Sequence, residues 1–223
     1  MGMKQILVMM AVVVLVGCSN ETPGTSQAAE AEAQVASKPT PEPTPVSPAE
    51  EKSISIADPI VEKAVRIVIN KPEGKLTEKD LEKITGLSLS DTKITDEGLK
   101  EVAKLQQLTL LYLNDTKVTD AGLKEVAKLQ RLDYLFLSGT QITDAGLKEV
   151  AKLQNLTELR LASTEITDAG LKEVAKLHNL KELILSDTKI TDAGLKDVAK
   201  LQKLTILDLY GTQITDVGLK DVA

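Results

Sequence analysis

Few residues in this sequence have the types and spacing that catalysis or metal binding would need. The chain has one histidine and one cysteine, and it lacks a His-x-x-x-His pair, a Gly-x-Ser-x-Gly turn and a glycine-rich phosphate loop. The histidine, His178, takes a position that glutamine occupies in most neighbouring copies of a repeat, which favours a surface residue over a base without partners. We therefore predict that the protein is not an enzyme and uses no cofactor.

A column of aspartates has a spacing that could collect a cation. Its members recur every 24 residues and are Asp96, Asp120, Asp144, Asp168, Asp192 and Asp216. Carboxylates are ligands that hard cations prefer. Each aspartate also stands at the start of a predicted helix, where a negative charge compensates the helix dipole without any metal. We adopt dipole compensation as the interpretation and predict no metal site.

The cysteine stands at the end of an N-terminal targeting segment. Lys4 precedes an apolar run, "ILVMMAVVVLVG", that is too short to span a bilayer comfortably. The run leads into "LVGC", residues 15–18, which resembles the lipobox of bacterial lipoproteins. The resemblance implies a signal peptide over residues 1–17, cleavage before Cys18 and lipidation of the Cys18 thiol. The alternative is an uncleaved N-terminal anchor in which the cysteine is incidental.

The expected location is the bacterial cell envelope, with a lipid membrane as one partner. Several acyl chains together give stable anchoring, because each buried methylene contributes about 0.8 kcal/mol. Ser19 follows the cysteine where lipoproteins of the inner membrane have Asp, so the resemblance implies the outer membrane if the organism has two membranes. Nucleic acid is not an expected partner, because the formal net charge is −6 and phosphate binding needs a basic face.

Residues 18–53 comprise the lipidated cysteine and a linker rich in Pro, Glu, Ala and Thr. The prolines of its second half are Pro39, Pro41, Pro43, Pro45 and Pro48. Proline removes a backbone donor and biases the preceding residue toward extended geometry, so we predict a disordered, semi-stiff tether. Extended at about 3.1 Å per residue, it would reach on the order of 100 Å. A polyproline ligand for another protein is the alternative interpretation.

From residue 84 to the end the chain repeats itself. A Thr-Asp pair recurs every 24 residues, and each unit contains Leu-x-x-Leu-x-Leu-x-x-Thr, as at Leu108, Leu111, Leu113 and Thr116. The period and the following "TxITDxGL" resemble bacterial leucine-rich repeats. The resemblance implies an α/β fold: a right-handed β–α solenoid of about six repeats over residues 84–223, with a parallel concave sheet and convex helices.

Elementary patterning leads to the same architecture. Leu111 and Leu113 share one face of a strand, and the apolar residues of "TDAGLKEVAKL" recur at helical spacing with Thr119 as a suitable N-cap. Each unit has one apolar face that it cannot bury alone, so the units must stack. A column of threonines is expected to bond turn backbone groups. Its members are Thr92, Thr116, Thr140, Thr164, Thr188 and Thr212.

The ends of the stack need caps, because terminal units would otherwise expose their core. Residues 54–83 resemble the helical N-terminal cap of internalin-like bacterial surface proteins. Asp58 followed by Pro59 predicts a helix start. The apolar face of this helix is expected to consist of Ile60, Ala64, Ile67 and Val68. At the C-terminus, either the last helix covers the stack or the sequence is incomplete.

The informative residues are those that vary between repeats. They lie on the predicted concave face, whereas the convex helices repeat Lys, Glu and Ala almost unchanged. Every aromatic residue falls on this face and none in the predicted core. Tyr112, Phe136 and Arg160 are expected side by side, on strands about 4.8 Å apart. The predicted ligand-binding residues are Leu110, Tyr112, Tyr134, Phe136, Glu158, Arg160, Glu182, Ile184, Asp208 and Tyr210.

The predicted concave face also indicates a class of function. Aromatic residues and Arg are the types that anchor protein interfaces. We predict a monomeric, envelope-anchored lipoprotein that binds a protein or another macromolecule through this sheet without catalysis. The alternative is a structural spacer or assembly element of the envelope without a specific concave ligand. That alternative would attribute the aromatic residues to their high β-propensity alone.

Overall fold

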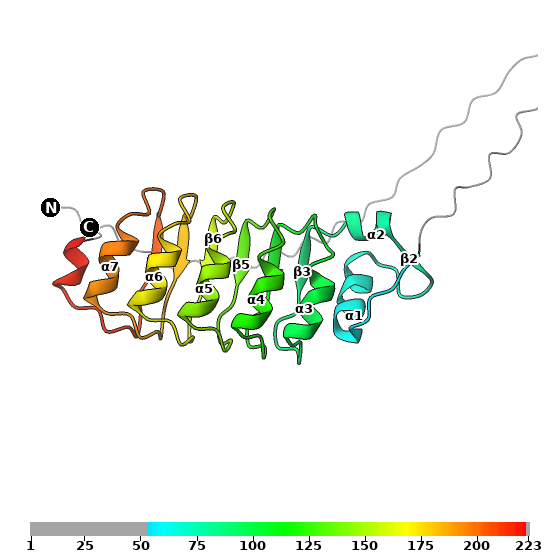
Figure 1. Cartoon of the computed structure of the whole chain (residues 1–223), viewed down its shortest axis with the longest axis horizontal. Coiled ribbons are helices and arrows are strands. Elements are labelled where there is room, and N and C mark those ends of the chain that lie inside the picture. Colours follow the sequence, from blue (N-terminus) through cyan, green and yellow to red (C-terminus); the bar gives the residue numbers. More distant parts are fainter. Residues whose placement is uncertain (1–52, 222–223) are drawn as a thin grey trace, which may run out of the picture. The chain divides into compact units, whose positions relative to one another are not determined.

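The computed structural model describes residues 53–221, in which short strands alternate with short helices (Figure 1). The predicted signal peptide, Cys18 and the predicted tether as far as residue 52 lie outside the described residues. The strands of the repeats are β3 Gly86–Ser88, β4 Leu110–Tyr112, β5 Tyr134–Phe136, β6 Glu158–Arg160, β7 Glu182–Ile184 and β8 Ile206–Asp208. The helices are α3 Asp96–Val102, α4 Asp120–Val126, α5 Asp144–Val150, α6 Asp168–Val174, α7 Asp192–Val198 and the 3-10 helix η1 Gly218–Asp221.

The repeat strands form one parallel sheet in chain order, from β3 to β8. Each residue pairs with the equivalent residue of the next repeat, as Leu111 pairs with Leu135 and Leu135 with Leu159. Figure 1 shows the helices α3 to α7 side by side along one face of the strands. The predicted arrangement, a parallel sheet with the helices packed along one of its two faces, is confirmed.

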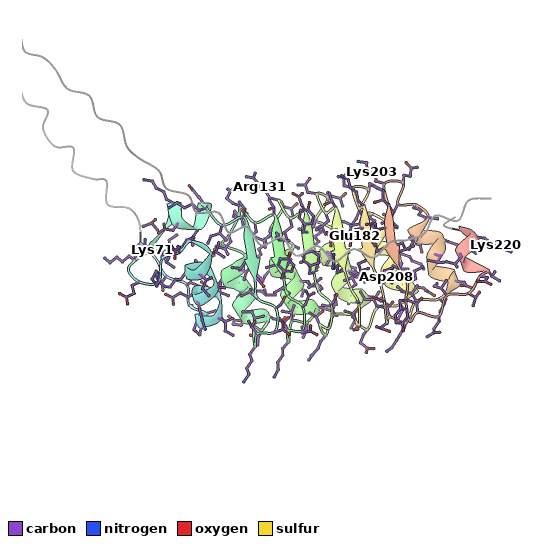
Figure 2. All side chains as sticks on the ribbon, turned by 180° about the vertical axis from the view of Figure 1, so that it is seen from behind. Lys71, Arg131, Glu182, Lys203, Asp208 and Lys220 are labelled. Carbon is purple, nitrogen blue, oxygen red and sulfur yellow. The ribbon has the colours of Figure 1, made fainter. Side chains whose placement is uncertain are left out.

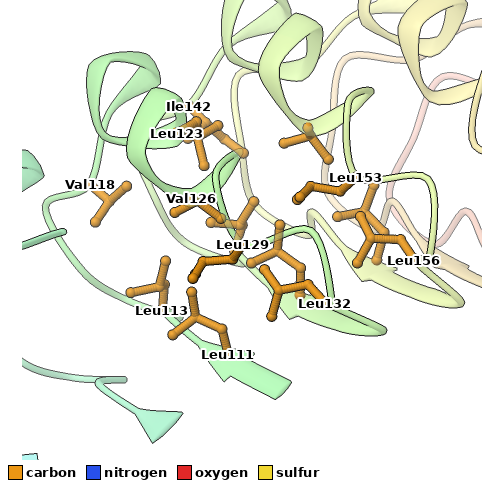
Figure 3. Packing of buried hydrophobic residues seen from close by; sticks show 14 of the residues in the cluster. Leu111, Leu113, Val118, Leu123, Val126, Leu129, Leu132, Ile142, Leu153 and Leu156 are labelled. Carbon is orange, nitrogen blue, oxygen red and sulfur yellow. The ribbon is translucent and has the colours of Figure 1, made fainter. Parts of the chain in front are cut away.

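The core lies between the sheet and the helices (Figure 3). In the second repeat, the strand contributes Leu111, the residue directly after it is Leu113, and the helix contributes Leu123 and Val126. Each of these side chains is no more than 1% exposed. Fully burying a side chain of this kind contributes about 1.5–3 kcal/mol relative to leaving it in water. Because the same positions recur in the neighbouring repeats, one continuous aliphatic cluster runs through the stack.

Successive repeats are joined by an aspartate–threonine clasp. The carboxylate of Asp120 accepts hydrogen bonds from the backbone nitrogen of Thr143 at 2.8 Å and from its Oγ1 at 2.7 Å. The Thr143 hydroxyl oxygen in turn accepts the N–H of Ala145 at 3.2 Å, and so caps α5. The same pair of carboxylate bonds ties Asp96, Asp144, Asp168 and Asp192 to the threonine 23 residues later.

The clasp gives the aspartate column a larger role than the dipole compensation predicted for it. Hydrogen bonds from the Thr215 hydroxyl and backbone lower the pKa of the Asp192 carboxyl, as expected when a carboxylate accepts bonds in its charged form. The second threonine column acts within repeats. Thr140 Oγ1 donates to the Leu137 carbonyl at 2.6 Å, and its equivalents in the other repeats make the same bond, as predicted.

The N-terminal cap consists of α1 Pro59–Val68, α2 Glu78–Glu82 and a two-stranded antiparallel sheet of β1 Ser53–Ile54 and β2 Leu76–Thr77. Asp58 is the N-cap of α1, as predicted, and its Oδ1 accepts from the nitrogens of Ile60 and Val61 at 2.8 and 3.0 Å. The helix ends before Asn70, which adopts a positive φ of 51°. Ser53, which the sequence places in the tether, pairs with Thr77 in the small sheet.

The apolar face predicted for α1 is wrong in part. Val61 and Val65 are the fully buried side chains of this helix, whereas Ile67 is 69% exposed and Val68 is 46% exposed. The reason lies in how the helix begins. Its N-cap, Asp58, lies close to Gly98 of α3, and in this placement α1 packs on β3 and α3 with Val61 and Val65 facing inward. At the other end of the described chain, η1 takes the place of an α-helix and leaves Val217 exposed.

The clasp generates a prediction at the glycine that follows it. A Cβ at Gly146 would lie 2.4 Å from Oδ1 of Asp120 and 2.7 Å from Cδ1 of Leu123. We expect Gly146→Ala to lower the free energy of unfolding by about 1–3 kcal/mol, because the aspartate of the preceding repeat occupies that space. Urea unfolding followed by circular dichroism measures the change.

Gly86→Ala is the matched control, because a Cβ there meets Leu110 at an ordinary 3.6 Å. Its unfolding free energy should stay within about 0.5 kcal/mol of that of the wild type. Helix propensity alone would make Gly146→Ala more stable by about 1 kcal/mol. A stabilised Gly146→Ala variant would contradict the close approach of Asp120.

Candidate functional site

The candidate site is the face of the sheet that points away from the helices, which we call the open face. Its residues form columns across the strands because every strand pairs in the same register. The first column contains Leu110, Tyr134, Glu158, Glu182 and Ile206, and the second contains Tyr112, Phe136, Arg160, Ile184 and Asp208. Figure 2 shows Glu182 and Asp208 on this side of the molecule.

Three side chains of the second column stack on one another. The rings of Tyr112 and Phe136 lie 4.5 Å apart, centroid to centroid, with an angle of 16° between their planes. The guanidinium carbon of Arg160 lies 4.9 Å from the centroid of the Phe136 ring. A cation over an aromatic face is attracted by the ring quadrupole, and offset aromatic pairs add further stabilisation. The predicted adjacency of these three residues is confirmed.

Phe136 corrects one sequence-based expectation. No aromatic side chain was expected to be buried, yet Phe136 is only 5% exposed. Tyr112 covers one side of its ring and Arg160 covers the other. Phe136 therefore holds its neighbours in place and offers little surface of its own to a ligand. Direct contact with a ligand is therefore expected from the more exposed residues around Phe136.

Arg160 also lies between two carboxylates of the first column. Its Nε donates to Oε1 of Glu158 at 2.6 Å, and its Nη2 donates to Oε1 of Glu182 at 3.1 Å. The Glu158 side chain is 14% exposed and the Glu182 side chain 23%. Burial raises the pKa of the Glu182 carboxyl and the charge of Glu158 raises it further, whereas Arg160 opposes the rise. One guanidinium thus compensates two carboxylates only in part.

The remaining predicted residues surround this centre. Tyr134 is 41% exposed beside Glu158, and Leu110 and Ile184 are half-buried neighbours in the two columns. Two residues after β8 ends, Tyr210 is 79% exposed. The Asp208 carboxylate accepts the Tyr210 backbone N–H at 2.9 Å and is engaged by its own turn. The structure therefore brings the residues of β4 to β7 together, and it places Asp208 and Tyr210 at the margin.

Several chemical alternatives can be examined directly. Among residues 53–221, no group of three His, Cys, Asp or Glu side chains is arranged to hold a metal ion. His178 is exposed. In the same part of the chain, none of the helices combines the length and the apolarity needed to cross a membrane. Cys18 lies outside the described residues.

One surface feature was not among the predicted site residues. An apolar groove of about 510 Å³ lies along the junction of α1 and the first repeat and is lined by Ile60, Ala64, Ile67, Val68 and Leu89, among others. Its only signal in the sequence is the apolar spacing of α1, which does not distinguish a buried stripe from an exposed one. The groove exists because α1 packs through Val61 and Val65 instead.

Family models of leucine-rich repeats match several parts of the chain. A family model of two leucine-rich repeats matches residues 178–221, and a single-repeat model matches residues 81–103 and 152–175. Among solved structures the chain is similar to internalin C2 of Listeria monocytogenes, with 26% identity over 75% of this chain and 91% of that chain and a TM-score of 0.46. A second internalin of that organism shows 20% identity over 74% and 73% of the two chains, with a TM-score of 0.31. No curated protein matches the sequence.

The fold is therefore the predicted α/β leucine-rich-repeat solenoid. The family models match residues near the start, in the middle and at the end of the repeat region, and the sheet order and register follow the repeat throughout. Leucine-rich repeats suggest a protein-interaction module, which agrees with the exposed aromatic and charged residues of the open face.

The partly compensated carboxylates generate a prediction about pH. Because folding raises the pKa of Glu182 above its ordinary value of 4.5, the folded state favours the protonated form. The resulting penalty is absent well below pH 4.5 and complete once the pH exceeds the raised pKa. We expect Glu182→Gln, which stays neutral, to raise the free energy of unfolding at pH 7 by up to about 1 kcal/mol. Below about pH 4 the gain should vanish.

Urea unfolding at pH 3 and pH 7 measures this difference. The matched control is Glu173→Gln on α6, where the carboxylate pairs with Lys176 at 2.6 Å and no second carboxylate shares that lysine. The control should show no gain at pH 7. A Glu182→Gln variant that is no more stable than the wild type at pH 7 would contradict the partial compensation.

Proposed function

We propose that this protein is an exported lipoprotein, anchored in the bacterial cell envelope through lipidated Cys18, that binds another protein through the open face of its sheet. It acts without catalysis. The observation that carries the binding function is the contrast between the two faces of the solenoid. One face repeats its sequence, and the other presents a pre-formed cluster of aromatic and charged side chains.

The contrast is visible in adjacent elements. Helices α4, α5 and α6 have the identical sequence DAGLKEV, whereas β4, β5 and β6 read LLY, YLF and ELR. The buried leucine in the middle of each strand is retained, and only the outward residues differ. The need to stack therefore explains why the helices and the central leucine of each strand are constant. It does not explain why the outward strand residues differ.

The geometry of the cluster suits a binding surface. The side chain of Arg160 is held by Phe136 and two glutamates, so a partner would not have to order it on binding. Tyr134 presents a large side chain whose ordering costs little entropy. Aromatic residues and arginine are also the types most often found at interface hot spots. An envelope spacer, the alternative function, requires only the stack and none of these contacts.

Anchoring rests on the sequence. Cys18 is the only cysteine and follows an apolar run with lipobox spacing. The next residue is Ser19 and not the Asp that retains lipoproteins in the inner membrane. The proline-rich tether would give the repeats reach away from the lipid surface, on the order of 100 Å if extended. In this proposal the tether positions the open face for a partner in or beyond the envelope.

The binding function can be tested by affinity capture with the full chain. We expect the envelope proteins that bind the wild type to bind a Tyr134→Ala/Arg160→Ala variant at least about tenfold more weakly, which corresponds to about 1.4 kcal/mol. Quantitative mass spectrometry of the bound fraction measures the loss. The matched control is Lys148→Ala/Lys172→Ala on the convex helices, where both side chains are exposed.

Both variants should first be shown to unfold cooperatively at temperatures close to that of the wild type. The control should retain every partner. Equal retention of all captured proteins by the open-face variant would instead support the spacer.

The anchor requires a separate test. Radiolabelled palmitate is expected to label the wild-type protein in cells, and Cys18→Ser should remove the label and release the protein from the membrane fraction. Labelling that persists in the Cys18→Ser variant would rule out lipidation at this cysteine and favour the uncleaved anchor.

A further inference from the structure

The charges of the open face are unbalanced. The two columns of the described strands contain three carboxylates, those of Glu158, Glu182 and Asp208, and one cationic group, the guanidinium of Arg160. Asp208 is engaged by its own turn, so the imbalance centres on Glu158 and Glu182. Both carboxylates contact Arg160 through Oε1, and a carboxylate can accept about four hydrogen bonds. The pair can therefore accept a second cation.

Without a second cation, the two neighbouring negative charges of Glu158 and Glu182 are energetically unfavourable where they lie. Both side chains are more than three-quarters buried, so water compensates them incompletely. The raised pKa of the Glu182 carboxyl agrees with this imbalance. A positive charge from a partner would relieve the repulsion between the two carboxylates as well as adding its own bonds.

Apolar side chains stand on both sides of the two carboxylates. Along the first column the order is Tyr134, Glu158, Glu182 and Ile206, and the outer two are 41% and 47% exposed. These residues lie on four neighbouring strands about 4.8 Å apart, so the row extends about 14 Å. The row is thus apolar at each end and acidic at its centre.

This spacing matches an extended polypeptide that crosses the strands. Side chains at positions i, i+2 and i+4 of such a chain project to one side and span about 14 Å, at about 3.4 Å per residue. The central side chain would lie midway between Glu158 and Glu182. The outer two would lie against Tyr134 and Ile206.

We propose that the open face recognises an extended protein segment of the pattern apolar–x–Lys/Arg–x–apolar, with the basic side chain bonded to the Glu158 and Glu182 carboxylates beside Arg160. The inference rests on the proposed binding function and specifies the chemistry of its partner. A glycan is less well matched, because a neutral sugar would leave the two partly compensated carboxylates at the centre of the row without a second cation.

The test uses the purified full-length protein and a displayed library of random 12-residue peptides as the probe. We expect peptides selected on the wild type to be enriched in Lys or Arg, with apolar residues two positions before and after. Their affinity should fall at least tenfold for a Glu158→Gln/Glu182→Gln variant. The matched control, Glu149→Gln/Glu173→Gln, removes the same charge from convex glutamates of similar exposure and should bind normally.

A change on the peptide side keeps the test independent of the folding of any variant. Replacing the central Lys or Arg of a selected peptide by Gln should weaken its binding to the wild type by at least tenfold. Equal binding of the Gln peptide, or selected peptides without basic residues, would overturn the proposed pattern. Enrichment of a displayed glycan set but of no peptide would also overturn it.

The outcomes separate this inference from the proposed function. Selected peptides that are lost on Tyr134→Ala/Arg160→Ala but bind the Gln variant normally would leave open-face binding intact and reject the basic pattern. Peptides that bind the Tyr134→Ala/Arg160→Ala variant as well as the wild type would reject both.

Discussion

The dependence of each repeat on its neighbour is the constraint from which the rest of the structure follows. A single unit of strand, turn and helix cannot cover its own leucines, so it is stable only when the next unit is stacked in register. The Asp–Thr clasp sets that register on the helix side, and the parallel ladder sets it on the sheet side. Both operate at the repeat length, which explains why a Thr-Asp-x-Gly phrase recurs with so little change.

The same constraint leaves one face of the molecule free. Outward strand residues take no part in stacking the core, so their identities can serve another purpose, and in this chain they assemble an ordered cluster. Phe136 is held between Tyr112 and Arg160, and Arg160 is held by two glutamates. The regularity of the scaffold brings these residues together, because equivalent positions in successive repeats become neighbours across the sheet.

The sequence predicts those features that depend on the period, and it does not predict those that depend on local docking. Adjacent positions for Tyr112, Phe136 and Arg160 follow from the constant spacing alone. The burial of Phe136 does not, because it depends on which side chains cover the ring. Similarly, the apolar spacing of α1 allows more than one inner stripe, and only the packing of α1 on the first repeat decides that Val61 and Val65 are buried. The clasp escaped prediction because its partners are 23 residues apart and meet only once the helices are stacked.

The central claim is that the open face, and not the convex face, meets a partner. Site-specific photo-crosslinking in living cells tests it most directly, with benzoylphenylalanine placed at Tyr134 on the open face or at exposed His178, which lies outside the sheet in the turn after α6. The account predicts a discrete crosslinked protein from position 134 and none from position 178. Crosslinks of equal yield from both positions, or a discrete product from position 178 alone, would contradict it.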